Sequence, residues 1–384
     1  MTGAPLRVAF HVEGATIRGN ERQLLEVARE LGERGHRLVV SCRAGGPVQA
    51  AFEGAGIRTT GVRPRGDLDL ASAARFARWL RRERPDAVLL TSWKRALAAG
   101  WAARRAGVPR VALRVGGVHA IPPGARGWKY RRALVRYVDA VIANSSLVRE
   151  HLLAHVPGLA PGAVYLVPNG VRPRPAPPAP LREELGIPAG AVLAAAVGGL
   201  EPRKGFDVLL RALACAGRPD LHLVVAGEGP RLEALRGRAG ELGVAGRVHW
   251  LGQRADVPAV LSAADLFVLS SRSEGMSVAM LEAMAARRPV VSTDVGGARD
   301  ALAPRSARPA AGWIVPPGDP AALAGAMGEV ADGLGRDPAA VRARVEEAAW
   351  RLRHWFTVEA MVDGVEAALR GSREAAPPGT DPAP

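Results

Sequence analysis

The chain has 384 residues, of which 48% are hydrophobic and 23% are charged; this composition is normal for a soluble globular enzyme, and the length favours two domains. Its net charge of +15 favours anionic partners such as nucleotides, nucleic acid or an anionic membrane surface, although an arginine-rich composition can raise the charge with no functional meaning. The two cysteines, Cys42 and Cys215, stand far apart, which excludes a disulfide framework or a CxxC metal site and favours a reducing compartment.

The first half of the chain alternates short apolar runs with stretches of helical periodicity. Strands are predicted over residues 6–11, 37–41, 87–90, 111–115, 140–143 and 164–167. Helices are predicted over residues 20–34, 70–83, 96–105, 128–137 and 146–155, and Gly35 is expected to end the first of them. Because such alternation is typical of a parallel, doubly wound sheet, residues 1–171 are predicted to form an N-terminal Rossmann-like domain.

A proline-rich segment then interrupts the alternation. The sequence VRPRPAPPAP cannot sustain a helix or a central strand, and residues 172–188 are predicted to be a semi-rigid linker. Further strands are predicted over residues 192–197, 221–225, 248–251, 266–269 and 289–292, and helices over residues 206–215, 231–242, 256–263 and 277–286. We therefore expect a C-terminal Rossmann-like domain over residues 189–355, a closing helix over 356–370 and a disordered tail over 371–384.

The sequence predicts no segment that carries the chain into or across a membrane. Its start lacks the charged region and long apolar core of a signal peptide, and no apolar run approaches the ~20 residues that span a bilayer. We therefore expect a cytoplasmic protein, with attachment to the inner face of the membrane as an open alternative.

The strongest chemical signal follows the apolar strand predicted at residues 266–269 and reads SSRSEGMSVAMLEAMAA. Its two carboxylates, Glu274 and Glu282, stand about two helical turns apart and can lie on similar sides of a helix. Backbone N–H groups of the Gly-Met-Ser sequence between them would lie at the helix N-terminus, which is an anion site. The segment therefore predicts amide donors for a phosphate beside carboxylates for sugar hydroxyls, against the alternative of a helix cap and a solvated glutamate.

A second signal, VGGLEPRKGF, also follows an apolar strand. Gly198 and Gly199 allow close backbone approach, while Arg203 and Lys204 place two cations in the next loop. Cations are not expected beside a helix N-terminus, so solvated loop charges explain this pair poorly. The segment predicts a diphosphate-binding loop.

Together these residues resemble the group 1 (family 4) retaining glycosyltransferases of GT-B fold, in which two Rossmann-like α/β domains face each other across a cleft. The resemblance extends over nearly the whole chain. Its matching pieces are RGNERQLLEVARELGERGH, AVIANSSLV, VYLVPNGV, VGGLEPRKGFDVLLRAL, VVAGEGPRLEAL and VPAVLSAADLFVLSSRSEGMSVAMLEAMAARRPVVSTDVGG.

The resemblance implies a role for each matching residue. Arg203 and Lys204 would bind the donor diphosphate and stabilise the leaving group, and Glu274 would hold hydroxyls of the transferred sugar. Glu282 would hydrogen-bond the nucleotide ribose. The remaining donor-binding residues would be Gly19, Gly199, Gly275, Met276, Ser277 and Val278.

The resemblance also implies the chemistry. Family members retain the anomeric configuration without a divalent metal, which fits the lack of a DxD motif in a plausible metal-binding loop, because Asp67 and Asp69 read as a helix start. No cofactor is expected, since the nucleotide sugar is a substrate; a UDP-sugar is favoured and a GDP-sugar comes second. The first domain would bind the acceptor, a glycan or lipid-linked molecule of bacterial cell-surface synthesis.

Two loops of the first domain leave alternatives open. His119 lies in a Gly-rich loop after the strand at residues 111–115, and the resemblance implies that it contacts the donor sugar near the scissile bond; Arg114 is the alternative there. Near the start of the chain, Arg18 precedes Gly19 where the family often has a second glycine, and this arginine either contacts a phosphate or is an exposed loop residue.

Basic residues gather in two segments of the first domain, among Trp79, Trp128 and Tyr130. A basic face with interfacial aromatic residues suits an anionic membrane or a lipid-linked acceptor, and a solvated helix face is the alternative. The clustered cations are Arg75, Arg78, Arg81, Arg82, Arg84, Arg126, Lys129, Arg131, Arg132 and Arg136.

Three other functions compete with glycosyl transfer. A nucleotide-sugar epimerase shares the architecture but needs an acid and base pair in the cleft, and the Glu274–Glu282 spacing with Arg203 and Lys204 favours transfer. A nicotinamide-dependent oxidoreductase needs a GxGxxG fingerprint after its first strand, which HVEGAT does not supply. A non-catalytic protein that binds sugar nucleotides or nucleic acid is the third, although no nucleic-acid-binding motif is present and aromatic residues are only 4% of the chain.

Overall fold

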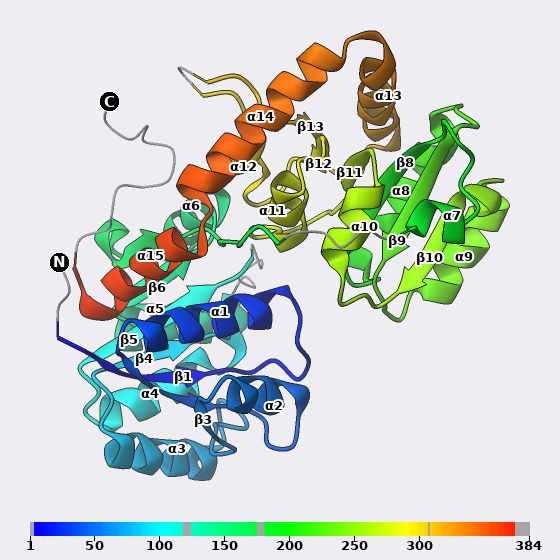
Figure 1. Cartoon of the computed structure of the whole chain (residues 1–384). Helices are drawn as coiled ribbons and strands as arrows, with labels where there is room; N and C mark the ends of the chain where they lie inside the picture. The colour runs from blue at the N-terminus through cyan, green and yellow to red at the C-terminus, as the bar shows by residue number, and fades with distance from the viewer. Residues whose placement is uncertain (1–3, 118–123, 175–179, 306–307, 373–384) are drawn as a thin grey trace. The chain divides into compact units, whose positions relative to one another are not determined.

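The computed structural model describes residues 4–117, 124–174, 180–305 and 308–372. It divides into two compact units, of which the first combines Met1–Gly170 with Val358–Pro384 and the second is Val171–Thr357. Each unit is built on a parallel sheet with helices on both faces (Figure 1), which confirms the predicted pair of Rossmann-like α/β domains. Among the helices in the described ranges, none has the length and apolar character needed to cross a bilayer.

The first unit has a seven-stranded sheet in the order β3-β2-β1-β4-β5-β6-β7. Its strands are β1 (Arg7–His11), β2 (Arg37–Ser41), β3 (Arg58–Thr60), β4 (Ala87–Leu90), β5 (Arg110–Val115), β6 (Ala140–Ala143) and β7 (Val164–Leu166). Its helices are α1 (Gly19–Glu33), α2 (Pro47–Gly54), α3 (Leu70–Glu83), α4 (Ala96–Arg105), α5 (Gly124–Tyr137), α6 (Ser146–His155) and α15 (Val358–Arg370), with short 3-10 turns at η1 (Trp93–Arg95) and η2 (Pro161–Ala163).

Alternate residues of each strand of the first unit enter different cores, as the two-residue period of a strand requires. Val8 and Phe10 pack with α1, α2 and α15 on one face of the sheet, whereas Ala9 packs with α3, α4, α5 and α6 on the other. Since both faces are covered, most of the strands consist mainly of buried apolar residues, which made them easy to predict.

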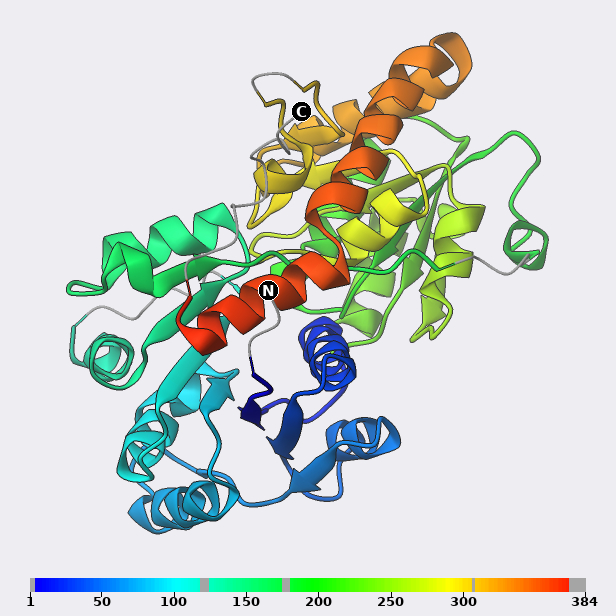
Figure 2. The same ribbon diagram turned by 60° about the vertical axis from the view of Figure 1, so that its left-hand side comes forward.

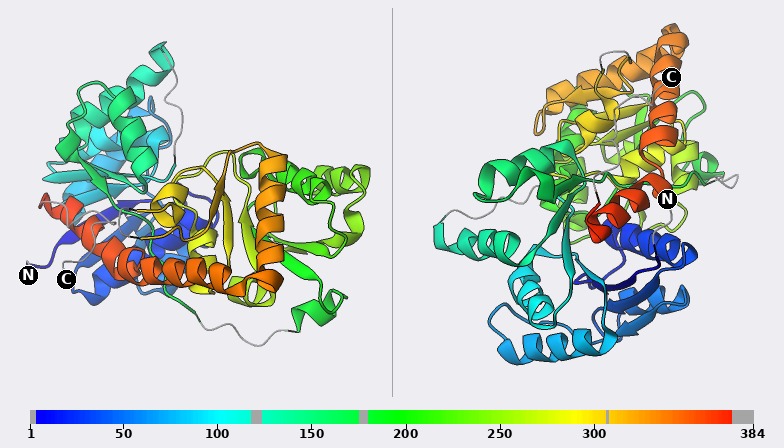
Figure 3. Two further views of the ribbon diagram at one scale, coloured as in Figure 1. Left: turned by 90° about the horizontal axis from the view of Figure 1, so that it is seen from above. Right: turned by 90° about the vertical axis from the view of Figure 1, so that its left-hand side faces the viewer.

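The second unit has a six-stranded sheet in the order β10-β9-β8-β11-β12-β13. Its strands are β8 (Val192–Val197), β9 (Leu221–Ala226), β10 (Val248–Gly252), β11 (Leu266–Leu269), β12 (Val290–Thr293) and β13 (Trp313–Val315). Its helices are α7 (Leu181–Glu184), α8 (Phe206–Cys215), α9 (Leu232–Glu241), α10 (Val257–Ala263), α11 (Val278–Ala285), α12 (Ala298–Leu302), α13 (Pro320–Arg336) and α14 (Pro338–Trp355), with 3-10 turns at η3 (Pro202–Lys204) and η4 (Ala245–Arg247). In Figure 3, α13 and α14 appear in orange, and the two helices contact each other.

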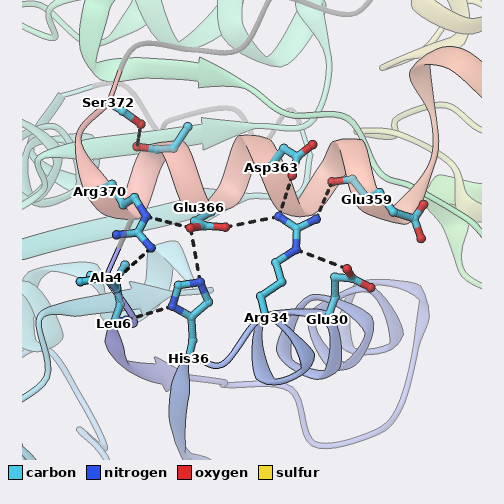
Figure 4. Close-up of polar contacts among 11 residues, drawn as sticks. Ala4, Leu6, Glu30, Arg34, His36, Glu359, Asp363, Glu366, Arg370 and Ser372 are labelled. Atoms are coloured by element: carbon cyan, nitrogen blue, oxygen red, sulfur yellow. Dashed lines mark hydrogen bonds and ion pairs between the residues drawn. The ribbon is translucent and has the colours of Figure 1, made fainter. Parts of the chain in front are cut away.

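Helix α15 returns the chain to the first unit, where it lies beside α1 (Figure 2). Figure 4 shows the polar network that holds it there: Glu366 pairs with Arg370 at 2.8 Å, with Arg34 at 3.3 Å and with His36 Nε2 at 3.3 Å. Arg34 also bonds Asp363 at 2.6 Å. These contacts, together with the apolar residues beneath them, make α15 an integral part of the first unit.

Two predicted boundaries differ from the structure. The first unit is not confined to residues 1–171, because the predicted closing helix at 356–370 begins at Val358 and belongs to that unit. The predicted linker at 172–188 contains α7. Arg182 of α7 forms a hydrogen bond with Asp265 and donates a second hydrogen bond, of 2.8 Å, to the Ala263 carbonyl. Residues 180–188 are therefore folded onto the second unit. Most of the predicted tail lies outside the described residues, but Ser372 O accepts a bond from the Tyr165 hydroxyl at 3.0 Å.

Several elements, most of them short, were absent from the sequence prediction. They are α2, β3, α7, α12, β13 and α13. β3 has the sequence RTT, with no buried residue, and so carries no apolar run. α13 has regular apolar spacing and an N-cap at Asp319, which accepts bonds from Ala321 N and Ala322 N, so its signal was present in the sequence and was overlooked.

Candidate active site

The candidate site of the second unit lies where the strand order of its sheet reverses. β8 pairs with β9 on one side and with β11 on the other, and β11 continues to β12. The loop after β8 carries Arg203 and Lys204, and the loop after β11 carries Glu274. Because ligands of doubly wound sheets bind at the carboxyl ends of the strands at this reversal, the two predicted motifs occupy the expected edge.

The side chains of these two loops meet although they are about 70 residues apart in the sequence. Lys204 Nζ lies 2.5 Å from Glu274 Oε1, and Arg203 Nη1 donates to Glu274 Oε2 at 3.2 Å. Ser271 Oγ donates to the same Oε1 at 2.8 Å. The Glu274 side chain is 9% exposed and Arg203 is 47% exposed, so a nearly buried carboxylate is paired with a cation that reaches solvent. The structure thus brings three of the predicted site residues together.

Backbone contacts hold the two loops against each other. Gly205 has a φ of 65°, and a Cβ atom on it would lie 2.1 Å from the Ser270 carbonyl oxygen, so only glycine fits there. Ser270 Oγ donates to the Lys204 carbonyl at 3.0 Å, and Arg272 N donates to the Arg203 carbonyl at 2.7 Å. The positions of Arg203 and Lys204 are therefore set by the segment that carries Glu274.

A side-chain clamp that sequence reasoning missed strengthens this junction. Arg272 forms a bidentate pair with Asp207, at 2.7 and 2.6 Å, and also donates to the Pro202 carbonyl at 2.8 Å. The hydrogen bond from Arg272 lowers the pKa of Asp207. The sequence offered one signal, since Asp207 is an acidic residue in the first turn of a helix that follows two cations, but its partner lies 65 residues away.

The N-terminus of α11 is built from the Gly-Met-Ser sequence. Ser277 is the N-cap, and its hydroxyl accepts a bond from Met280 N at 3.3 Å. Gly297 N donates to the Gly275 carbonyl at 2.5 Å, and a Cβ atom on Gly296 would lie 1.8 Å from that same oxygen. Both glycines come from the segment after β12, which therefore packs against the loop after β11, and sequence reasoning missed this contact.

The other donor-binding residues lie at three places. Val278 begins α11 and Glu282 lies one turn further along, half-buried, while Glu274 precedes the N-cap and is outside the helix. Gly199 lies in the loop after β8. The residue that follows it, Leu200, donates its N–H to the Glu228 carbonyl at 2.8 Å. Gly19 is the exposed first residue of α1 and belongs to the first unit.

His119 lies outside the described residues, so its predicted contact with the donor stays a prediction. Arg114, the alternative, is buried in the first unit, 3% exposed, and donates to Asn169 Oδ1 at 2.7 Å and to Asn20 Oδ1 at 3.3 Å. Burial lowers the pKa of Arg114 to about 10. Its side chain therefore links β5, α1 and the segment after β7.

Metal-ligating side chains do not gather in the described part of the chain, where no group of three or more His, Cys, Asp or Glu residues could hold an ion. Asp69 is the N-cap of α3 and accepts a bond from Ser72 N at 2.9 Å, as predicted for a helix start. Asp67 pairs with Lys129 at 2.8 Å.

Comparisons with protein-family models give the same answer for both halves of the chain. Residues 17–174 match the model described as Glycosyltransferase Family 4, and residues 192–332 match the model described as Glycosyl transferases group 1.

Curated relatives match part of their own length. A D-inositol 3-phosphate glycosyltransferase of Mycolicibacterium gilvum is 32% identical over 287 residues, which cover 70% of this chain and 60% of the relative. An alpha-maltose-1-phosphate synthase of Mycolicibacterium smegmatis is 31% identical, covering 55% of this chain and 60% of the relative. The lipopolysaccharide core biosynthesis mannosyltransferase LpsB of Rhizobium meliloti is 32% identical, covering 49% and 54%. The chain thus spans about three fifths or less of the length of these relatives.

Solved structures share the fold. Anabaena HepE in complex with UDP superposes with a TM-score of 0.81 at 20% identity, covering 95% of this chain and all of that chain. Sucrose-phosphate synthase from Thermosynechococcus elongatus gives 0.77 at 21% identity, covering 95% and 98%. At this level of identity, these matches establish the GT-B architecture of the two Rossmann-like units.

Proposed function

Because the chain belongs to the group 1, family 4 glycosyltransferases, we propose that it transfers a sugar from a nucleoside-diphosphate donor to an acceptor hydroxyl, with retention of the anomeric configuration and without a metal ion. The observation that carries this proposal is the convergence of Arg203, Lys204 and Glu274 at the strand reversal of the second unit. HepE binds UDP and UDP-glucose in its solved complexes, which favours a UDP-sugar as the donor, with a GDP-sugar second.

The pairing of Glu274 with two cations explains how a donor would be received. A diphosphate attracts Arg203 and Lys204 more strongly than one carboxylate does, because it carries more charge and more acceptor oxygens. As the cations turn to the diphosphate, the Glu274 carboxylate becomes available for sugar hydroxyls. The half-buried Glu282, within α11, is our candidate for the nucleotide ribose.

The chemistry then follows from charge placement. The acceptor hydroxyl attacks the anomeric carbon on the face from which the diphosphate departs, and the bond between that carbon and the phosphate oxygen breaks. The departing oxygen keeps the electron pair and accepts the acceptor's proton. Arg203, Lys204 and the first amides of α11 would stabilise the charge that develops on the diphosphate, which is generally the largest catalytic contribution in such a site.

The test is the affinity for UDP and for UDP-glucose, measured by titration calorimetry with and without EDTA. R203A/K204A should weaken UDP binding by at least about 100-fold, since two charge-assisted hydrogen bonds of about 1.5 kcal/mol each are lost. E274A should weaken UDP-glucose binding and leave UDP binding equal or tighter, because the cations lose their competing carboxylate.

A matched control removes two cations elsewhere in the same unit. Arg236 and Arg238 lie on α9 in ion pairs with Glu233 and Glu241, so R236A/R238A changes the net charge equally and should leave both affinities unchanged. Unchanged UDP affinity in R203A/K204A, or strict dependence on a divalent ion, would overturn the assignment. Equal losses for UDP and UDP-glucose in E274A would place Glu274 away from the sugar.

We further propose that the acceptor is a glycan or lipid-linked molecule of bacterial cell-surface synthesis, met at the inner face of the membrane. The first unit exposes large apolar side chains at Leu68, Leu70 and Trp128, which are 92%, 70% and 55% exposed. The ion pair between Lys129 and Asp67 brings these two segments together. The guanidinium carbon of Arg132 lies over the Trp128 ring, 5.3 Å from the ring centroid. Cations therefore lie beside the exposed apolar residues, an arrangement that suits an anionic lipid surface.

A further inference from the structure

The first unit also has a reversal of strand order, between β1 and β4, and a cluster of charged side chains lies there. β1 pairs with β2 on one side and with β4 on the other, and β4 continues to β5. Thr91, just after β4, donates its hydroxyl to the carbonyl of His11, the last residue of β1, at 2.9 Å. By the same topological rule that locates the donor site, this edge is where the first unit would bind a ligand.

A single carboxylate, that of Glu13, is fixed at this edge from the sheet side. Its Oε1 lies 3.1 Å from Nε2 of the buried His11, whose Nδ1 lies 3.1 Å from Ser41 Oγ. Ser41 in turn donates to the Val62 carbonyl at 2.7 Å. Burial would raise the pKa of Glu13, but the hydrogen bond and charge of His11 and the charges of two arginines outweigh it and hold that pKa below its usual range.

Those arginines, Arg63 and Arg95, approach the other oxygen of Glu13 without bonding it. Arg63 Nη1 is 3.9 Å and Arg95 Nε is 3.7 Å from Glu13 Oε2, both longer than a hydrogen bond. Arg95 Nε and the indole N–H of Trp93 are buried and have no hydrogen-bond partner in the described part of the chain. A bound ligand with acceptor oxygens would satisfy such donors.

The charge of Glu13 does not by itself explain why Arg63 and Arg95 lie here, because His11 already lies at hydrogen-bond distance from that carboxylate. Several arginines elsewhere in this chain bond carboxylates directly: Arg272 meets Asp207 at 2.6 Å and Arg254 meets Asp256 at 2.6 Å. Arg63 and Arg95 are 24% and 30% exposed, which leaves both guanidinium groups partly reachable from solvent. The cluster therefore has more positive charge and more N–H donors than its own carboxylate can use.

We propose that Arg63 and Arg95 form a subsite for a phosphate ester carried by the acceptor, an inference that rests on the proposed function. Guanidinium groups match phosphate oxygens through paired N–H donors, and the unused guanidinium donors of this cluster would then be satisfied. Glu13, anchored by His11, is a positioning residue that keeps both guanidinium groups at the edge of the sheet. A soluble sugar phosphate and a lipid-linked phosphate share this chemistry.

The test uses titration calorimetry on the full chain, with and without saturating UDP. The probes are glucose 1-phosphate and glucose 6-phosphate for the soluble source, dihexanoyl phosphatidic acid below its micellar concentration for the lipid source, and glucose as the uncharged counterpart. At least one phosphate ester should bind and glucose should not. R63Q/R95Q should weaken that binding by about 100-fold, as expected for two lost charge-assisted bonds, with UDP affinity unchanged.

Two further variants keep the result interpretable. R37Q/R58Q removes two cations at the amino ends of β2 and β3, the opposite edge of the same sheet, and should bind phosphate esters as the unmodified chain does. R63K/R95K keeps the charge without the planar fork and should retain intermediate affinity, which guards against loss of fold in the glutamine variant.

The outcomes separate the two proposals. Phosphate esters that bind no better than glucose, or binding that R63Q/R95Q leaves intact, would overturn the subsite while UDP binding continued to support the proposed function. Conversely, phosphate binding that depends on Arg63 and Arg95, in a chain that binds no nucleoside diphosphate or its sugar, would reject the proposed function and retain the anion site.

Discussion

At the scale of single residues, Gly205 connects the donor loops to the fold. Its left-handed backbone and its contact with the Ser270 carbonyl let the Arg203–Lys204 turn lie against the segment that carries Glu274. The cation pair and the carboxylate thus depend on a residue that has no side chain and touches no substrate in the proposed reaction.

We expect Gly205→Ala to cost about 2–4 kcal/mol of unfolding free energy, because the new Cβ adds a steric clash to the cost of the left-handed backbone. Gly217→Ala is the matched control: Gly217 also has a positive φ, 62°, but a Cβ there would meet nothing within 4 Å. It should cost only about 1–2 kcal/mol. Urea unfolding measures both, and equal losses would show that the contact with Ser270 is unimportant.

At the scale of elements, the network between α15 and α1 makes the first unit sensitive to acid. Leu6 N donates to His36 Nδ1 at 2.9 Å, so that nitrogen is the acceptor, and Nε2 faces Glu366. A proton on Nδ1 would break the bond from Leu6. Burial lowers the pKa of His36. Burial alone would raise the pKa of Glu366, but hydrogen bonds and charges from Arg370, His36 and Arg34 outweigh burial, so the pKa of Glu366 is also lowered.

Both shifts have the same consequence for stability. The folded chain binds fewer protons at His36 and Glu366 than the unfolded chain does. The stability that these groups contribute is therefore present above their unfolded pKa values, near 6.5 for His and 4.3 for Glu, and is lost as pH falls through the lower folded values. We expect the thermal midpoint of the first unit to fall between about pH 7 and pH 5. His36→Asn, which keeps an acceptor and a donor but does not titrate, should reduce that fall.

The control for this experiment is His155→Asn, since His155 is exposed on α6 and lies outside the network. Its pH profile should match that of the unmodified chain. A fall in midpoint that His36→Asn leaves unchanged would mean that other groups govern the acid sensitivity.

At the scale of the whole molecule, the membrane face proposed for the first unit can be tested by co-sedimentation with vesicles. L68S/L70S/W128S should bind vesicles of phosphatidylglycerol and phosphatidylcholine on the order of tenfold less than the unmodified chain, because three apolar side chains lose their burial in lipid. Leu147→Ser, at another exposed leucine of the same unit, should bind normally. Equal binding of all variants, or no preference for anionic vesicles, would contradict the proposal.

How far the sequence predicted this molecule depends on the distance between interacting residues. Most strands were predictable because both faces of each sheet are covered, which produces continuous apolar runs such as AVLL in β4 and LFVL in β11. The donor motifs were predictable because each lies within a single loop. The Arg272–Asp207 clamp and the cluster around Glu13 were not, since their members are brought together only by the topology of the sheets.

The return of α15 to the first unit also has a consequence for synthesis. A ribosome adds residues from the N-terminus to the C-terminus, so all of Val171–Thr357 is made before the helix that completes the first unit. Val362 and Val365 of α15 belong to the core on one face of the first sheet, and that face stays partly uncovered until α15 has been made. The unit that is encoded second can therefore complete its fold on the ribosome before the unit that is encoded first.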